Sequence, residues 1–178
     1  MEQYEQLLKR VFLDKTLTDI EFFDHDLRYV SPDMEQMWIV DGGVQFHFDD
    51  EYVSFAYSGE FQFFNIFLGK VQELPNDFEM KPLGAMDVEG IKSLIGKTVV
   101  DVKAIWNFYK ELDEDFEEID EKKYMPFEIL VTFNDGSFLQ IAAIEFKILD
   151  NQIVNLHYNS ERDIVISLNK KLTIGDEL

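Results

Sequence analysis

Cysteine is absent from this chain of 178 residues, and basic residues are scarce. Without cysteine the chain can form no disulfide, thiolate zinc site or iron–sulfur cluster, and it has no cysteine nucleophile. Only 16 Lys and Arg oppose 36 Asp and Glu, so the formal net charge is −20 at pH 7. Phosphate backbones and anionic lipids are bound mainly through lysine and arginine. We therefore expect no direct binding to nucleic acid or to a membrane.

Long apolar runs are also missing. No stretch approaches the roughly 18 apolar residues of a membrane-spanning helix. The first residues, Met1 to Glu5, lack the basic and apolar regions of a secretory signal. These absences predict a soluble, cytoplasmic protein.

What the chain has instead is a large apolar content. Hydrophobic residues make up 46% of the sequence and aromatic residues 15%, including 17 Phe. Highly charged chains with few apolar residues stay disordered, but this composition can fill a core. The length predicts a single compact domain over residues 1–178, with the alternative of two packed halves at 1–80 and 86–178.

Hydrophobic periodicity predicts an α+β fold. Apolar residues recur with helical spacing over residues 4–12, and a short second helix is expected near 87–95, capped by Asp87 and ended by Gly96. Strands are expected at the following β-rich runs: 18–23, 27–30, 38–40, 44–48, 53–57, 61–68, 99–106, 127–133, 138–148, 153–158 and 164–168. Short turns between them indicate antiparallel meanders.

The order of helix and meander occurs twice. An offset of 85 residues aligns Val44 with Ile129 and Phe46 with Val131, and it also aligns the starts of the two helices. This alignment suggests a tandem duplication of a helix-plus-meander unit. The alternative is that two amphipathic hairpins align over a few residues by coincidence.

The densest charge lies at residues 111–121, where eight of eleven residues are acidic. These acids are Glu111, Asp113, Glu114, Asp115, Glu117, Glu118, Asp120 and Glu121. The apolar residues among them, spaced by three or four, predict an amphipathic helix with its acids facing outward. One interpretation is a helix or loop that is merely solvated; the other is an acidic docking surface for a cationic partner.

The sequence contains no strong pattern for a metal-binding site. EF-hand registers beginning at Asp113 and at Asp49 both lack the glycine required at position six. His47 and Asp49 are weak candidates, because residues two apart on a strand project from the same face. A catalytic zinc site usually needs three protein ligands, and a solvent-facing polar strand explains the pair equally well. We expect no metal and no cofactor.

Motifs for catalysis are absent from the sequence. The tripeptide Gly96-Lys97-Thr98 resembles the end of a phosphate-binding loop, but the expected order of helix before strand is the reverse of that motif. There is no G-x-S-x-G or G-x-G-x-x-G sequence. Nothing in the sequence marks an enzyme.

These observations favour a protein-binding module for a basic partner protein. Its sharpest form is an immunity or antitoxin-type inhibitor, since such small acidic proteins mask a cationic face. The alternative is a small-ligand-binding protein or enzyme with an aromatic-lined pocket near His47 or Trp106. A third interpretation is a structural subunit of an assembly. The sequence does not determine the oligomeric state.

Overall fold

The structure is a computed structural model that describes residues 1–24, 36–40, 42–49, 51–57, 64–73, 81–83, 89–112, 118–149, 152–159 and 163–175. The helical elements are α1 (Glu2–Phe12), the 3-10 turn η1 (Val71–Glu73) and α2 (Glu89–Lys92). The strands are β1 (Asp19–Asp24), β2 (Met37–Val40), β3 (Gly43–Phe48), β4 (Glu51–Tyr57), β5 (Phe64–Leu68), β6 (Lys81–Leu83), β7 (Val99–Leu112), β8 (Glu118–Phe133), β9 (Phe138–Leu149), β10 (Gln152–Tyr158) and β11 (Asp163–Leu168).

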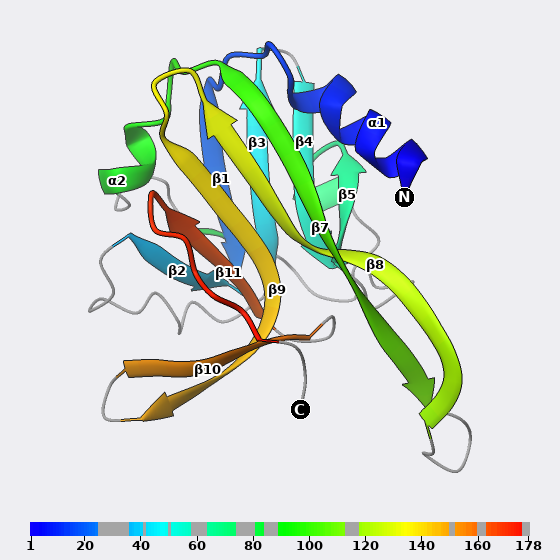
Figure 1. Cartoon of the computed structure of the whole chain (residues 1–178). Coiled ribbons are helices and arrows are strands. Elements are labelled where there is room, and N and C mark those ends of the chain that lie inside the picture. Colours follow the sequence, from blue (N-terminus) through cyan, green and yellow to red (C-terminus); the bar gives the residue numbers. More distant parts are fainter. Residues whose placement is uncertain are drawn as a thin grey trace.

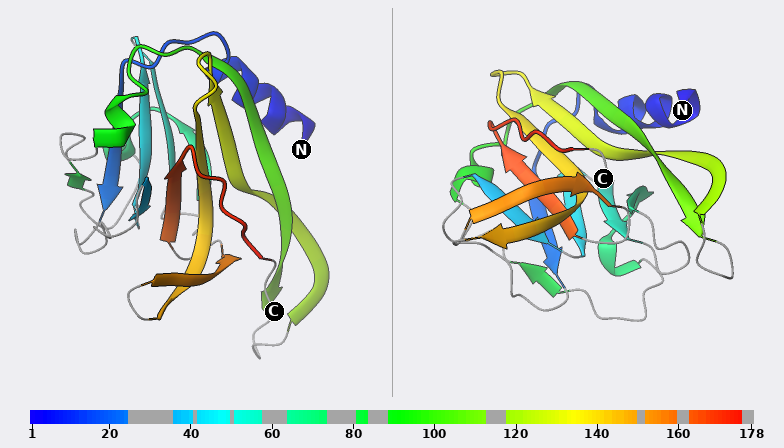
Figure 2. Two further views of the ribbon diagram at one scale, coloured as in Figure 1. Left: turned by 60° about the vertical axis from the view of Figure 1, so that its left-hand side comes forward. Right: turned by 60° about the horizontal axis from the view of Figure 1, so that its bottom comes forward.

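Two antiparallel sheets face each other, with α1 beside β7 (Figure 1). The first sheet has the order β5-β4-β3-β1-β6. The second has the order β2-β11-β9-β8-β7, and β10 pairs with β9. Figure 2 shows the same two layers from further sides. The predicted α+β class with antiparallel sheet and two helices is therefore confirmed.

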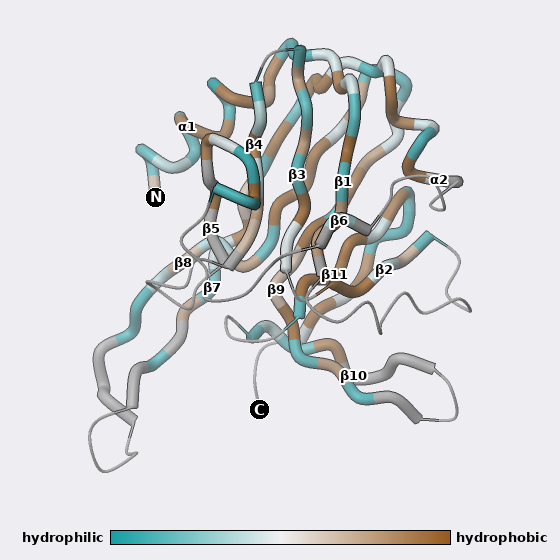
Figure 3. Tube along the Cα trace, turned by 180° about the vertical axis from the view of Figure 1, so that it is seen from behind, coloured by the Kyte–Doolittle hydropathy of each residue, from teal (hydrophilic) through white to brown (hydrophobic). Residues whose placement is uncertain are grey.

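The main core fills the space between the sheets. Alternate residues point inward on each strand, so Val44 and Phe46 of β3 lie in one cluster with Ile129 and Val131 of β8. In Figure 3 the strands of both sheets carry many hydrophobic residues, which are drawn brown. The predicted period-two pattern of these strands thus corresponds to their burial in the sandwich.

Helix α1 closes this core through one face. Leu8, Val11 and Phe12 are buried, as the predicted spacing requires. The Phe12 ring lies 5.2 Å from the ring of Phe46 and 5.3 Å from that of Phe48, in edge-to-face geometry. An isolated helix of this length is marginal in water, so these contacts stabilise it.

A second apolar cluster lies on the outer face of the second sheet. Its buried members are Met37, Ile39, Ala142, Ile144, Val165 and Leu172. Leu172 comes from residues 170–175, an extended segment after β11 that we call the strap; it is the red trace in Figure 1. Because Leu172 is part of the cluster, the strap covers some of this sheet face.

The order in which the strands pair differs from that of two separate meanders. Strand β2 pairs with β11 in the second sheet, although it precedes β3 of the first sheet. Strand β6, which the sequence did not predict, pairs with β1. The tandem duplication and the division into halves stay predictions.

One predicted helix is wrong. Residues 111–112 end β7 and residues 118–121 begin β8, so this part of the acidic run is extended rather than helical. The physical reason is pairing across the hairpin, which aligns Leu112 with Glu118 and Lys110 with Lys122. Like charges spaced four apart oppose a helix, and a helix could not supply these non-local hydrogen bonds. Residues 113–117 lie outside the described part.

No helix of the described part is long and apolar enough to cross a membrane.

Candidate functional site

A long hairpin projects from the sandwich. Strands β7 and β8 pair along their length and continue past the other strands, as Figure 1 shows at its lower right. We call residues 108–112 together with 118–124 the arm. The arm begins where burial ends: Met125 belongs to the core, whereas the neighbouring Tyr124 is 57% exposed.

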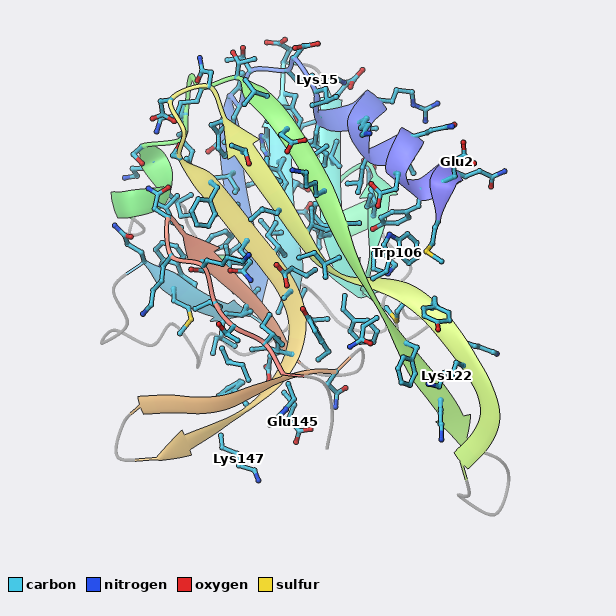
Figure 4. The ribbon with its side chains drawn as sticks, in the orientation of Figure 1. Glu2, Lys15, Trp106, Lys122, Glu145 and Lys147 are labelled. Carbon is cyan, nitrogen blue, oxygen red and sulfur yellow. The ribbon has the colours of Figure 1, made fainter. Side chains whose placement is uncertain are left out.

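Two aromatic side chains lie exposed at the start of the arm. Phe108 and Tyr124 are cross-strand partners, and their ring centroids are 6.1 Å apart. Phe108 is 40% exposed, and the Lys122 ammonium sits 3.9 Å from the centre of its ring. Figure 4 labels Lys122 on this hairpin. Contiguous exposed apolar groups often mark interaction sites, and tyrosine is enriched at protein interfaces.

The acidic run continues from these aromatics to the end of the arm. Glu111 lies near the end of β7, and Glu118, Asp120 and Glu121 lie at the start of β8. The other four acids, Asp113, Glu114, Asp115 and Glu117, lie outside the described residues. Four of the eight predicted partner-binding residues are therefore placed together on one projecting hairpin.

The base of the arm is fixed to α1. The Trp106 indole N–H donates to Glu5 Oε1 at 3.0 Å, and the Trp106 ring packs edge-on against Tyr4 at 5.4 Å. Trp106 is labelled beside α1 in Figure 4. Burial, with a smaller contribution from the Glu5 charge, raises the pKa of Tyr4 well above its usual range. Trp106 thus serves as a packing contact between helix and hairpin.

His47 belongs to a polar cluster on the outer face of the first sheet. Its Nε2 lies 2.8 Å from Glu21 Oε2 on the adjacent strand β1. The His47 ring packs edge-on against Tyr52 at 4.6 Å, and the Lys70 ammonium lies 4.7 Å from the centre of the Tyr52 ring. A carboxylate that holds one imidazole nitrogen can orient the ring as a proton acceptor or donor.

Gln45 fixes the geometry of this cluster. The Val71 backbone N–H donates to Gln45 Oε1 at 2.8 Å, so the amide nitrogen faces the other way. That nitrogen donates to Glu21 Oε2 at 2.7 Å and also lies 2.9 Å from His47 Nε2. Gln45 is buried, and its side chain ties η1 to β3 and β1.

The expectation that His47 and Asp49 project from the same face depends on a strand that continues through residue 49. Strand β3 ends at Phe48, and Asp49 follows in a turn with a left-handed φ of 52°. Strand alternation therefore stops before Asp49, and the hydrogen bonds of His47 go to Glu21 and Gln45 instead. Among the described residues no group of three or more metal-ligating side chains could hold an ion. His25 lies outside the described part, and His157 is half-buried in β10.

The resemblance of residues 96–98 to a phosphate-binding loop is explained by the fold. Helix α2 precedes β7, so the order is helix then strand, as predicted. Gly96 has a φ of 83° in the turn between them. Lys97 forms an ion pair of 2.6 Å with Asp135. Lys97 and the hydroxyl and backbone N–H of Ser137 lower the pKa of Asp135.

Sequence reasoning missed a buried carboxyl group. Glu128 of β8 is 3% exposed on the outer face of the second sheet. Tyr158 Oη donates to its Oε2 at 2.9 Å, and Gln140 Nε2 donates to its Oε1 at 3.0 Å. Burial raises the pKa of Glu128, while these two hydrogen bonds and the charge of Lys171 act in the opposite direction. The alternation of β8 could have placed Glu128 opposite the core face, but its hydrogen bonds with Gln140 of β9 and Tyr158 of β10 could not be anticipated.

No protein-family model matches this chain, and no curated protein or solved structure matches it either.

Proposed function

We propose that this chain is a protein-binding module whose arm engages a basic partner protein. The observation that carries the proposal is the position of the acidic run. Its described residues, 111–112 and 118–121, lie on a hairpin that projects from the sandwich and also carries two exposed aromatic side chains. A projecting hairpin can reach into a concave surface that the flat sheets cannot enter.

The arm combines the two kinds of contact that protein interfaces use. Clustered carboxylates accelerate the encounter with a cationic surface, because opposite charges steer diffusion. Exposed aromatic side chains then supply buried area at the centre of the interface, where most of the binding energy resides. Phe108 already has a lysine ammonium over its ring, and Tyr124 offers a partner's lysine or arginine a second ring.

The finer proposal is an immunity or antitoxin-type inhibitor. Its support is the size of the chain, the charge of −20 and the absence of catalytic sequence motifs. A protein that masks the cationic active face of a toxic enzyme has to bind quickly, and charge complementarity provides that rate.

The test is capture of a basic protein by two variants with equal charge. The arm variant changes Glu111, Glu118, Asp120 and Glu121 to their amides. The control variant does the same to Glu2, Asp49, Glu73 and Glu145, which are exposed away from the arm. Each changes the formal net charge from −20 to −16, since four carboxylates are removed.

We expect the original chain to capture a basic protein, and the control to bind that purified protein nearly as tightly. The arm variant should bind it at least about fourfold more weakly at low salt, since exposed ion pairs contribute roughly 0.2–1 kcal/mol each. The difference should shrink as salt rises. Equal loss in both variants, or capture of only neutral and acidic proteins, would contradict the proposal.

A second candidate, a small-ligand-binding protein or enzyme, is favoured by the Glu21–His47 pair. The pair is held by Gln45 and lies beside Tyr52, so an oriented imidazole is already in place. Screening small polar compounds by NMR would test it. Binding that shifts the His47 ring signals and is lost in Glu21→Gln supports this candidate; no shifts at His47 would count against it.

A further inference from the structure

The arm holds one of its own cations against an aromatic ring. The Lys122 ammonium of β8 lies 3.9 Å from the centre of the Phe108 ring on β7, within the distance of a cation–π contact. Phe108 pairs with Tyr124 across the hairpin, and Lys122 lies two residues before Tyr124 on the same strand. The lysine therefore reaches the ring along a cross-strand diagonal. The face of Phe108 is thus a surface that accepts a cation.

The surroundings of Lys122 explain why its ammonium lies over this ring. Its direct cross-strand partner is Lys110, and like charges in that position repel each other. Phe108 is 40% exposed, so its contact with Lys122 is open to solvent. Exposed cation–π contacts are weak, and the loss of one changes a binding equilibrium by about two- to fivefold. A competing cation can therefore replace the ammonium with little loss of free energy.

The charge of the hairpin attracts such a competitor. Residues 108–124 contain eight acids and three lysines, so their formal net charge is −5. Arginine suits an aromatic face better than lysine does, because its guanidinium group is planar and more weakly hydrated than an ammonium. The ring centre of Tyr124 lies 6.1 Å from that of Phe108, so a guanidinium over Phe108 would have a second ring beside it.

We propose, on the basis of the proposed function of the arm, that Lys122 occupies the position of an arginine of the partner protein, which displaces Lys122 from the Phe108 ring when the complex forms. A partner's lysine would only exchange one ammonium for another over the ring, whereas an arginine gains from stacking. Lys122 thus makes the arm selective for arginine.

An NMR titration of the unaltered chain with a short arginine–glycine peptide tests the displacement. Protons above the face of an aromatic ring resonate upfield, so the ε-methylene signal of Lys122 reports whether its ammonium lies over Phe108. We expect the arginine peptide, as it binds at low salt, to move this signal toward the position of an exposed lysine. A lysine–glycine peptide of the same length and charge should bind more weakly and displace Lys122 less.

Three results would overturn the proposal. The first is binding of the arginine peptide that leaves the Lys122 signal unchanged; the arm would then still bind cations, but without this displacement. The second is equal displacement of Lys122 by the two peptides, which would exclude selectivity for arginine. The third is an arginine peptide that does not bind the arm, and capture of a basic protein by the arm variant and its control would still test the proposed function separately.

A pair of variants tests the competition with the purified basic partner. Lys122→Gln and Lys123→Gln remove the same charge from adjacent residues of β8, whose side chains point to opposite faces. Lys122→Gln should bind the partner about two- to fivefold more tightly than Lys123→Gln, because only the first change clears the ring. In a Phe108→Leu background this difference should largely disappear. A difference of the same size in that background, or equal binding by the two variants when Phe108 is present, would contradict the competition.

Discussion

Replacement of Phe12 by alanine tests whether α1 closes the space between the two sheets. Phe12 is fully buried, and three phenylalanine rings lie within 6 Å of its ring centre, those of Phe46, Phe48 and Phe55. Phe→Ala substitutions at such sites cost about 3–5 kcal/mol. Total stabilities are about 5–15 kcal/mol, so this single change should remove a large part of the stability.

Urea and thermal unfolding, followed by circular dichroism, measure the loss. For a domain of this size each kcal/mol lowers Tm by roughly 2–4 °C, so Phe12→Ala should lower it by about 6–20 °C. Gln6→Ala on the exposed side of the same helix is the control, and it should change stability by no more than about 0.5 kcal/mol. A cost below about 1 kcal/mol for Phe12→Ala would refute the packing of α1 into the core.

Three further changes test other parts of the fold by urea unfolding. Gly43→Ala should destabilise by about 1–3 kcal/mol, because a Cβ there would lie 2.6 Å from the Phe55 carbonyl oxygen; an unchanged midpoint would contradict this close approach of β3 and β4. Gln45→Leu should cost about 1–3 kcal/mol, since it leaves the buried Val71 N–H without its acceptor, and a neutral result would show that the amide is dispensable. Asp135→Asn removes a carboxylate whose pKa is lowered by Lys97. The original chain should therefore be more stable than the variant above pH about 4, and the stabilities of the two proteins should converge as pH falls. A stability difference that is independent of pH would contradict the ion pair.

The strands and α1 could be predicted because their signals are local and periodic. Val44, Phe46 and Phe48 alternate in the sequence and are all buried on the inner face of β3. Leu8, Val11 and Phe12 follow helical spacing and pack into the same core. In each case the residue pattern that defines the buried face is contained within a single element.

What could not be predicted depends on pairing between distant segments. The acidic run has the apolar spacing of a helix, yet β7 and β8 pair across it and extend it into a hairpin. Strand β2 joins β11, more than a hundred residues later in the chain, and no pattern within residues 37–40 specifies that partner. The hydrogen bonds of Glu128 likewise form only when Gln140 of β9 and Tyr158 of β10 lie beside β8.

For the arm, the sequence predicted the acidic charge but not the projecting hairpin or its exposed aromatic side chains. Composition alone identified residues 111–121 as the densest acidic segment. Exposure of Phe108 and Tyr124 on the same hairpin became evident only in the structure, because both residues lie outside the strands predicted at 99–106 and 127–133. The pairing of His47 with Glu21, rather than with Asp49, follows from the register of β1 with β3.

Binding of the purified basic partner by the arm variant and its charge-matched control, across a salt titration, is the most direct test of the proposed role. We predict that the arm variant loses affinity at least about fourfold at low salt, that the control binds nearly as the original chain does, and that high salt removes the difference. Equal binding by the arm variant and its control at every salt concentration would show that the arm does not engage the partner.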